Sequence, residues 1–256
     1  MTLLHLSPAP PKARRAARLV FLFSLCLYGA TTGGSMATDI MTYEVTKAIV
    51  ERGSVAMSYN LFQMDAHRGV DGRYYAPFGI GHALYSVPFY LLGRTAERFT
   101  GGSVGRLESL RKGGMTVGSA VAAAASVWLT FWFSWALVGR IGPAVMAALA
   151  LGCATAMWPY AKFGFNAPLA TLCVLAAVYG AWIGARSNRV WMLVLSGAGI
   201  GGALLVRHEL VLVALPIALW LTLESWPDSR RAVRMVSVVA LPAIVGVVIT
   251  GYYNWT

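Results

Sequence analysis

Long uncharged stretches divide the sequence, and their lengths predict its helices. A helix needs about 20 apolar residues to cross the roughly 30 Å hydrocarbon core of a bilayer. Five of the last six stretches fit this length with little adjustment, whereas the 14 residues of 210–223 span only if His208, Glu209 and Glu224 lie at or near the interface. The stretches are 19–38, 74–93, 113–139, 141–161, 163–185, 190–206, 210–223 and 235–256.

The first two stretches are less uniform. Residues 19–30 are strongly apolar and follow a basic segment, which predicts a first transmembrane helix; a secretory signal peptide is the alternative. The stretch 74–93 contains Pro77, Pro88, His82 and three glycines. Because proline removes a helix hydrogen bond and kinks the chain, we expect a broken helix that lies in the membrane interface. An ordinary kinked spanning helix is the other interpretation.

The basic residues predict the orientation in the membrane. If 74–93 does not span, six arginines of the short loops lie on the same side as the basic N-terminal tail, and only Lys162 and Arg207 lie in the opposite short loops. Cytoplasmic loops carry an excess of Lys and Arg, so this arrangement is favoured. A spanning 74–93 would exchange the sides of those loops. The favoured arrangement has the N-terminus inside and the C-terminus outside.

This pattern predicts an all-α integral membrane protein with about seven transmembrane helices. Residues 1–18 would form a cytoplasmic tail, and residues 19–256 a single transmembrane domain. Residues 31–112 would be a large helical extracytoplasmic first loop within that domain. It holds seven of the ten acidic residues: Asp39, Glu44, Glu51, Asp65, Asp71, Glu97 and Glu108. The polar chemistry is therefore expected on this side.

Composition supports a membrane protein. Of the 256 residues, 57% are hydrophobic and 12% are charged, about half the usual share of charge in a soluble domain. A soluble globular enzyme of this size would need a larger polar shell and is excluded. The net charge of +11 fits membrane borders rather than nucleic acid, because no basic tract follows the N-terminal tail. Cys26, Cys153 and Cys173 lie in apolar stretches, which indicates neither a disulfide framework nor a zinc site.

Asp39 is the first residue that could carry chemistry. It follows the first apolar stretch directly, and the residues after it predict an amphipathic helix that ends at Gly53. Asp39 could cap that helix with its carboxylate. Alternatively, it is a carboxylate held near the lipid interface, where it can accept a proton from an incoming hydroxyl or amine.

Aromatic and basic residues offer further candidates. Tyr74 and Tyr75 precede Pro77 and fit either interfacial anchors or a carbohydrate platform. Lys162 is the one charge within 141–185, so it either extends to the interface or binds a phosphate.

A short charged cluster lies between two apolar stretches near residue 208. Charges at such positions are costly and often functional. Arg207 either pairs with Glu209 or binds a lipid diphosphate, with His208 beside it.

Together these segments resemble the GT-C glycosyltransferases. The similarity is to lipid-phosphate-sugar-dependent enzymes akin to protein mannosyltransferases and bacterial aminoarabinose transferases. It covers nearly the whole chain through loose motifs: TDIMTYEVTKAIVERG with Asp39 and Tyr43, GRYYAPFGIGHALYSVPFYLLG, ATAMWPYAKFGFNAP and GYYNWT. In that family, interface-lying helices follow the first span and an acid of that outer loop is the catalytic base. The resemblance implies this role for Asp39.

The implied activity is inverting hexosyl or pentosyl transfer from a polyprenyl-phosphate sugar, within the lipid of a bacterial inner (plasma) membrane. Charge on the leaving phosphate needs cations nearby. The residues expected to bind substrate are Tyr43, Tyr74, Tyr75, Lys162, Arg207, His208, Arg111 and Lys112.

Two features depart from the family pattern. Family members often have adjacent Asp and Glu in the first loop, but Ile40 follows Asp39 here, so no metal ligands are assigned and a divalent cation stays an open requirement. Family members also extend further than Thr256, which predicts an N-terminal fragment. A transporter subunit and a non-catalytic membrane scaffold therefore remain alternative functions, and the sequence makes no prediction of oligomeric state.

Overall fold

The structure is a computed structural model that describes residues 9–31, 33, 37–58, 67–100 and 104–255. Two short antiparallel strands, β1 (His67–Arg68) and β2 (Tyr74–Tyr75), form one hairpin. The helices are α1 (Pro11–Ala30), α2 (Ala37–Arg52), α3 (Gly81–Thr100), α4 (Val104–Val138), α5 (Ile141–Cys153), α6 (Met157–Lys162), α7 (Ala167–Ser187), α8 (Val190–Val206), the 3-10 helix η1 (His208–Val213), α9 (Ala214–Glu224) and α10 (Ser229–Trp255). The predicted all-α class is confirmed for the described residues.

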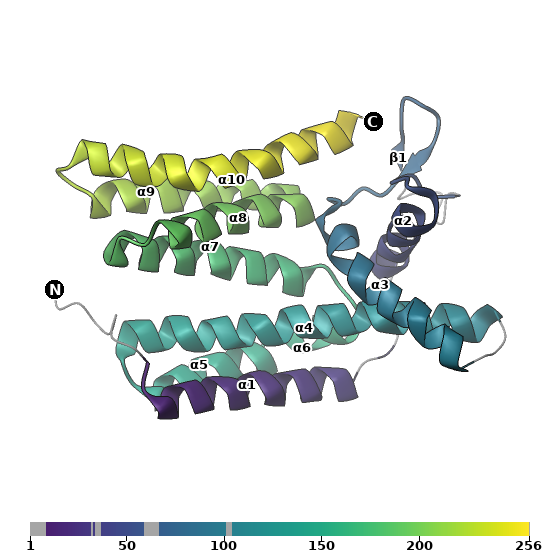
Figure 1. Cartoon of the computed structure of the whole chain (residues 1–256), viewed down its shortest axis with the longest axis horizontal. Helices are drawn as coiled ribbons and strands as arrows, with labels where there is room; N and C mark the ends of the chain where they lie inside the picture. The colour runs from purple at the N-terminus through teal and green to yellow at the C-terminus, as the bar shows by residue number, and fades with distance from the viewer. Residues whose placement is uncertain (1–8, 32, 34–36, 59–66, 101–103, 256) are drawn as a thin grey trace.

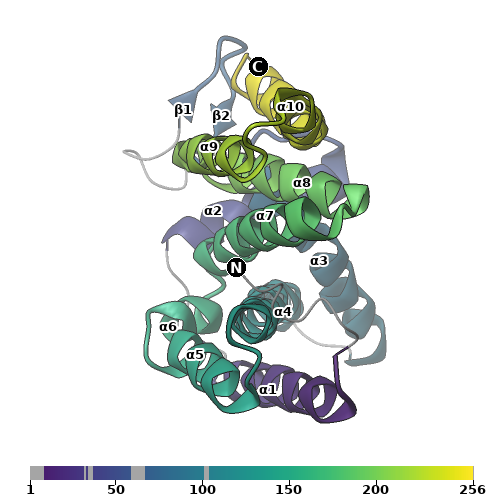
Figure 2. The same cartoon turned by 90° about the vertical axis from the view of Figure 1, so that its left-hand side faces the viewer.

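Most of the helices run along the long axis of the molecule, and the others cover one end (Figure 1). In one half, α1, α5 and α6 pack around α4. In the other half, α8 packs between α7 and α10, and α9 lies against α10 (Figure 2). Contacts between α4 and α7 join the halves. α2, α3 and the hairpin lie at the end where α4 begins and α10 finishes, which we call the capping end.

Among the described residues, three helices are long and apolar enough to cross a membrane, within Gly105–Val138, Ala167–Ser187 and Ser229–Trp255. Two further apolar helices, Ile141–Cys153 and Val190–Val206, are shorter. The described residues thus include the helices of a membrane protein, as the sequence predicts. The predicted count of seven spans is not established by these helices.

Three other predicted spans differ from single apolar α-helices in the structure. α1 begins at Pro11, so the helix itself contains basic residues that the sequence placed in a tail. The stretch 141–161 is divided at residues 154–156 into α5 and α6. The stretch 210–223 begins as a 3-10 helix and becomes α-helical at Ala214.

Close backbone contacts hold α7, α8 and α10 together. A Cβ atom added to Gly199 of α8 would lie 2.6 Å from the Cys173 carbonyl oxygen of α7. A Cβ atom added to Gly246 of α10 would lie 2.5 Å from the Cα atom of Gly201 in α8. Small residues at such positions allow helices to approach closely, because no side chain separates the backbones.

The capping end has its own small core. Met41 and Val45 of α2 pack with Met57 and with Ala83 of α3, and Tyr74 of the hairpin packs against this group. α2 ends at Arg52 and is followed by Gly53 with φ 62°, which confirms the predicted end of this helix. The capping layer is therefore held together by its own apolar contacts, and α3 packs it against α4 of the bundle.

The segment 74–93 adopts a different conformation from the broken helix that we expected. Its first two residues are strand β2, and α3 then continues without interruption from Gly81 through Pro88 to Thr100. The break therefore falls before the helix, in residues 76–80, rather than at the second proline. α3 packs on α4 at the capping end and is not among the helices long and apolar enough to span.

Candidate active site

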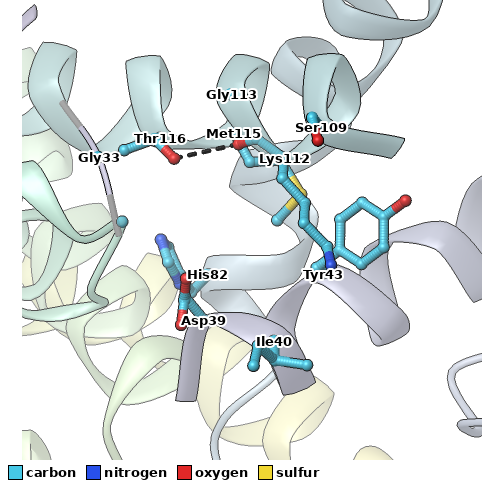
Figure 3. Close-up of a pocket in the computed structure, with 11 residues that line it drawn as sticks. Gly33, Asp39, Ile40, Tyr43, His82, Ser109, Lys112, Gly113, Met115 and Thr116 are labelled. Carbon is cyan, nitrogen blue, oxygen red and sulfur yellow. Dashed lines mark hydrogen bonds between the residues drawn. The ribbon is translucent and has the colours of Figure 1, made fainter. Parts of the chain in front are cut away.

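The cavity with the predicted acid lies at the capping end, where α2, α3 and α4 meet (Figure 3). Its volume is about 330 Å³. Three residues singled out in the sequence, Asp39, Tyr43 and Lys112, line it together. The full lining is Gly33, Asp39, Ile40, Tyr43, His82, Ser109, Lys112, Gly113, Met115, Thr116 and Gly164.

Helical spacing explains why residues from distant parts of the chain share this cavity. Asp39 and Tyr43 are four residues apart on α2, and Ser109, Lys112 and Thr116 recur every three or four residues on α4, so each set lies on one helix face. Figure 3 shows Lys112 reaching from α4 toward Tyr43 on α2. The two faces converge on the same space.

Asp39 lies in the first turn of α2, because this helix begins at Ala37. It is therefore inside the helix rather than at the cap position that one interpretation of the sequence gave it. The positive end of the helix dipole favours a carboxylate in the first turn. Asp39 also faces the cavity, where an acceptor hydroxyl could reach it.

Tyr43 is buried between α2 and α4. Its side chain is 2% exposed, and its hydroxyl group has no hydrogen-bond partner among the described residues. The Lys112 ammonium group lies 5.0 Å from the centre of its ring, within the range of a cation–π contact. Burial raises the pKa of Tyr43, so the phenol stays protonated and able to donate a hydrogen bond.

Lys112 is the cation of this cavity. Its Nζ atom lies 3.1 Å from Oε1 of Glu108, and both side chains are 42% exposed. Exposed ion pairs of this type contribute about 0–1 kcal/mol. Glu108 therefore holds Lys112 only weakly, and the ammonium group can bind an anion in the cavity instead.

His82 of α3 is a titratable residue of this cavity that sequence analysis did not select as a site residue. Its side chain is 4% exposed, and Nδ1 has no hydrogen-bond partner among the described residues. Burial lowers the pKa of His82 to about 4, so the ring is neutral at physiological pH. A histidine in an otherwise apolar stretch was the available signal, but it was interpreted only as a feature that makes 74–93 a poor span.

Arg111 lies outside the cavity, although it precedes Lys112 directly. Its guanidinium group forms a salt bridge with Glu97 of α3 and a second one of 3.0 Å with Glu51 of α2. Tyr90 donates a 2.7 Å hydrogen bond to the same Glu51 carboxylate. Hydrogen bonding from Arg111 lowers the pKa of Glu97. Arg111 therefore ties α2, α3 and α4 together.

The other predicted cations lie elsewhere at the capping end. Lys162 ends α6, and its Nζ atom lies 5.3 Å from the centre of the Phe163 ring; its carbonyl accepts a 3.3 Å hydrogen bond from Gly33. Arg207 binds Glu209 at 2.8 Å and lines a separate cavity of about 150 Å³. Neither side chain is part of the lining around Asp39.

The remaining predicted residues divide between a core and a third cavity. Tyr74 packs into the small core of the capping end. Tyr75 and His208 line a cavity of about 450 Å³ near the end of α10. The structure thus brings three of the nine predicted site residues into the Asp39 cavity.

The described residues contain no group of three or more His, Cys, Asp or Glu side chains that could hold a metal ion. The Asp39 cavity offers two potential ligands, Asp39 and His82. Accordingly, we assign no metal ligands here.

The sequence matches no family model, and neither a curated protein nor a solved structure matches it. The resemblance to GT-C glycosyltransferases therefore rests on the residues and motifs of the chain itself.

Proposed function

We propose that this protein is an inverting glycosyltransferase that moves a sugar from a polyprenyl-phosphate donor to an acceptor at the extracytoplasmic face of a bacterial plasma membrane. The observation that carries the proposal is the meeting of Asp39, Tyr43 and Lys112 around one cavity. The sequence predicted an acid, an aromatic residue and a cation for this chemistry. Asp39 and Tyr43 come from α2, and Lys112 comes from α4, more than sixty residues further along the chain.

The cavity contains the groups that such a transfer needs. Asp39 would take the proton from an acceptor hydroxyl while the oxygen attacks the anomeric carbon. The bond between that carbon and the phosphate oxygen would break, and Lys112 would stabilise the charge that develops on the leaving phosphate. The neutral His82 and the Tyr43 hydroxyl would orient sugar hydroxyl groups by hydrogen bonds.

The arrangement of the helices supports the orientation predicted from the sequence. The connections α4–α5, α7–α8 and α9–α10 lie at the end opposite the capping end (Figure 1). Six arginines lie in or directly beside these connections: Arg140 and Arg189 are in the connections themselves, Arg186 is in the last turn of α7, and Arg230, Arg231 and Arg234 are in the first two turns of α10. We propose that this end is cytoplasmic, because positive residues gather on that side.

The chain crosses the membrane seven times if each of two pairs of short helices forms one membrane-spanning unit. These crossings are α1, α4, α5 with α6, α7, α8, η1 with α9, and α10. At about 2.0 Å per residue for η1 and about 1.5 Å for α9, the second pair is roughly 28 Å long. It therefore approaches the thickness of the bilayer core.

Lys112 gives a direct test of donor binding. A charge-assisted contact to a partly desolvated phosphate is worth about 1.5–3 kcal/mol, so Lys112→Gln should raise the donor KM by roughly 10–150-fold. The acceptor KM should stay nearly constant. Steady-state kinetics with a radiolabelled polyprenyl-phosphate sugar would measure both.

Lys162→Gln and Arg207→Gln are matched controls, since both cations lie outside the Asp39 cavity. If the donor KM rises for either control but not for Lys112→Gln, the donor phosphate binds outside the Asp39 cavity. A wild-type protein that transfers no sugar from any such donor would instead be the scaffold that the sequence left open.

A further inference from the structure

A second site lies at the capping end, between the hairpin and the end of α10. Its main cavity has a volume of about 450 Å³ and shares no lining residue with the Asp39 cavity. It continues into the cavity of about 150 Å³ beside Arg207, because Pro77, Phe78 and His208 line both. The combined space is therefore separate from the proposed transfer chemistry.

Aromatic rings form one wall of the larger cavity. Tyr75 and Tyr253 meet edge to face with their ring centres 6.5 Å apart, and Trp255 lies beside them with 85% of its surface exposed. Ligand sites of this kind combine aromatic side chains with a few polar groups that fix orientation. A sugar ring suits such a wall, because it presents C–H groups to the aromatic faces and hydroxyl groups at its rim.

Buried polar atoms lie at the inner part of the site. Asn166 is 6% exposed, and its Oδ1 atom has no hydrogen-bond partner among the described residues. Nε2 of His208 is also buried and has no partner in the part of the chain that the structure describes. Buried polar groups normally form hydrogen bonds, so these two indicate a ligand with hydroxyl groups.

The charge of the larger cavity favours an anion. Arg68 lines it, donates a 3.3 Å hydrogen bond from Nε to the Gly72 carbonyl and forms no ion pair with the described residues. Among the described residues, no acidic side chain belongs to the lining. Two nearby acids of the described segments have other partners, since Asp71 pairs with Arg73 and Glu209 with Arg207. A carboxylate or phosphate on the ligand would therefore meet an available guanidinium group.

We propose that this second site binds an acidic saccharide, held by the aromatic wall and by Arg68. The site requires no chemistry at Asp39, because the two linings share no residue. A saccharide bound here at the capping end could be the acceptor of the proposed transfer. Binding itself can be measured whether or not transfer occurs.

Methyl glucuronide and methyl glucoside are the probes that test this proposal. The full chain, in nanodiscs of phosphatidylcholine, should bind the glucuronide at least about tenfold more tightly, as expected for one charge-assisted contact. Arg68→Gln should remove the preference for the glucuronide over the glucoside. Trp255→Ala should lower the affinity for both probes by about tenfold or more. Titration calorimetry and saturation-transfer NMR would measure both effects.

The chain offers a matched control for each variant. Arg106→Gln changes an exposed arginine of α4 that does not line the cavity, and Trp226→Ala removes a tryptophan that is 80% exposed at the opposite end of the bundle. Neither control should alter binding. Asp39→Asn should also bind the glucuronide like wild type. Loss of sugar transfer and loss of glucuronide binding are therefore measured separately, and either can occur without the other.

Three results would overturn the proposal. The first is the absence of saturable binding of either probe. The second is an equal loss of binding in Trp226→Ala or Arg106→Gln. The third is displacement of the glucuronide by phosphatidylglycerol added to the nanodiscs, with loss of that competition in Arg68→Gln, which would assign the site to a lipid headgroup.

Discussion

At the scale of single residues, Arg111 and Lys112 show how neighbours in sequence come to have different roles. Successive residues of an α-helix point about 100° apart. Arg111 therefore faces α3 and forms salt bridges with Glu97 and Glu51, whereas Lys112 faces the cavity with a weak partner in Glu108. The sequence offered them as one basic pair, but the helix places the first in a cluster of salt bridges and the second in the lining of the Asp39 cavity.

His82 predicts a specific dependence of stability on pH. Burial lowers the pKa of His82 to about 4, against about 6.5 in an unfolded chain. Between these values the unfolded state binds a proton that the folded state does not, so the free energy of unfolding should fall as pH decreases from about 6.5 to about 4. The full loss would be about 3 kcal/mol. Thermal unfolding across this pH range would measure it.

His82→Gln should remove the loss of unfolding free energy that comes from this histidine. His67→Gln, on the exposed hairpin, should retain that loss. Burial raises the pKa of Glu44, so Glu44 makes the free energy of unfolding change with pH in the opposite direction. Both variants retain Glu44, so its contribution is the same in each. If wild type and His82→Gln lost stability equally toward pH 4, the buried neutral histidine would be contradicted.

At the scale of elements, the contact between α8 and α10 depends on the absence of side chains. A Cβ atom at Gly246 would lie 2.5 Å from the Cα atom of Gly201, whereas one at Gly251 would have no neighbour within 4 Å. Gly246→Ala should therefore push the helices apart and lower the melting temperature. Gly251→Ala should leave it unchanged or raise it, because alanine favours helix by up to about 1 kcal/mol over glycine.

Thermal unfolding of the two variants in one detergent would compare them directly. Both changes add one methyl group to the same helix, so the difference reports the packing alone. Equal melting temperatures would show that α8 and α10 do not approach as closely as described.

The Arg111 cluster should contribute more to stability than the adjacent Lys112 pair. Arg111 is 22% exposed and Glu97 is 11% exposed, so their contact is partly protected from water. Arg111→Gln should cost about 1.5–3 kcal/mol of unfolding free energy, the range for hydrogen bonds to charged groups. Lys112→Gln should cost about 1 kcal/mol or less. Chemical unfolding would measure both, and a larger loss for Lys112→Gln would reverse the assigned roles.

The sequence predicted which segments are helical better than it predicted their interruptions. Apolar length identified α4, α7 and α10 and the short apolar helices α5 and α8, because a bilayer imposes that length on a span. It did not show that 141–161 divides into two helices or that α3 continues through Pro88. These details depend on the packing of neighbouring helices, which a pattern of hydrophobic residues does not contain.

At the scale of the whole molecule, the orientation of the chain can be tested by labelling. In a variant without Cys26, Cys153 and Cys173, single cysteines at Ser54 and at Ser103, which lies outside the described residues, should react from the same outer side. A cysteine at Asn188, in the α7–α8 connection, should react from the opposite side. Impermeant maleimides on spheroplasts would distinguish the sides. Labelling of Ser54 and Ser103 from opposite sides would show that the segment between Arg73 and Arg94 crosses the membrane.

The candidate site was only partly predictable from the sequence. Asp39 followed from its position after the first apolar stretch, and Tyr43 follows one turn later on the same helix face. Lys112 was only one of four cations named for substrate binding, and Arg207 had the clearer signal, because it lies between two apolar stretches. Arg207 instead binds Glu209, and His82 became visible only once α3 was placed against α2 and α4.

The central claim is that Asp39 removes the acceptor proton during transfer from a polyprenyl-phosphate sugar. Asp39→Asn retains the size and hydrogen-bonding capacity of the side chain but not its basicity. We expect this variant to lose transfer activity by about 100- to 10,000-fold, with a melting temperature close to that of wild type, while Asp71→Asn on the exposed hairpin remains active. A transfer rate for Asp39→Asn equal to that of wild type, in protein that is equally folded, would contradict the claim.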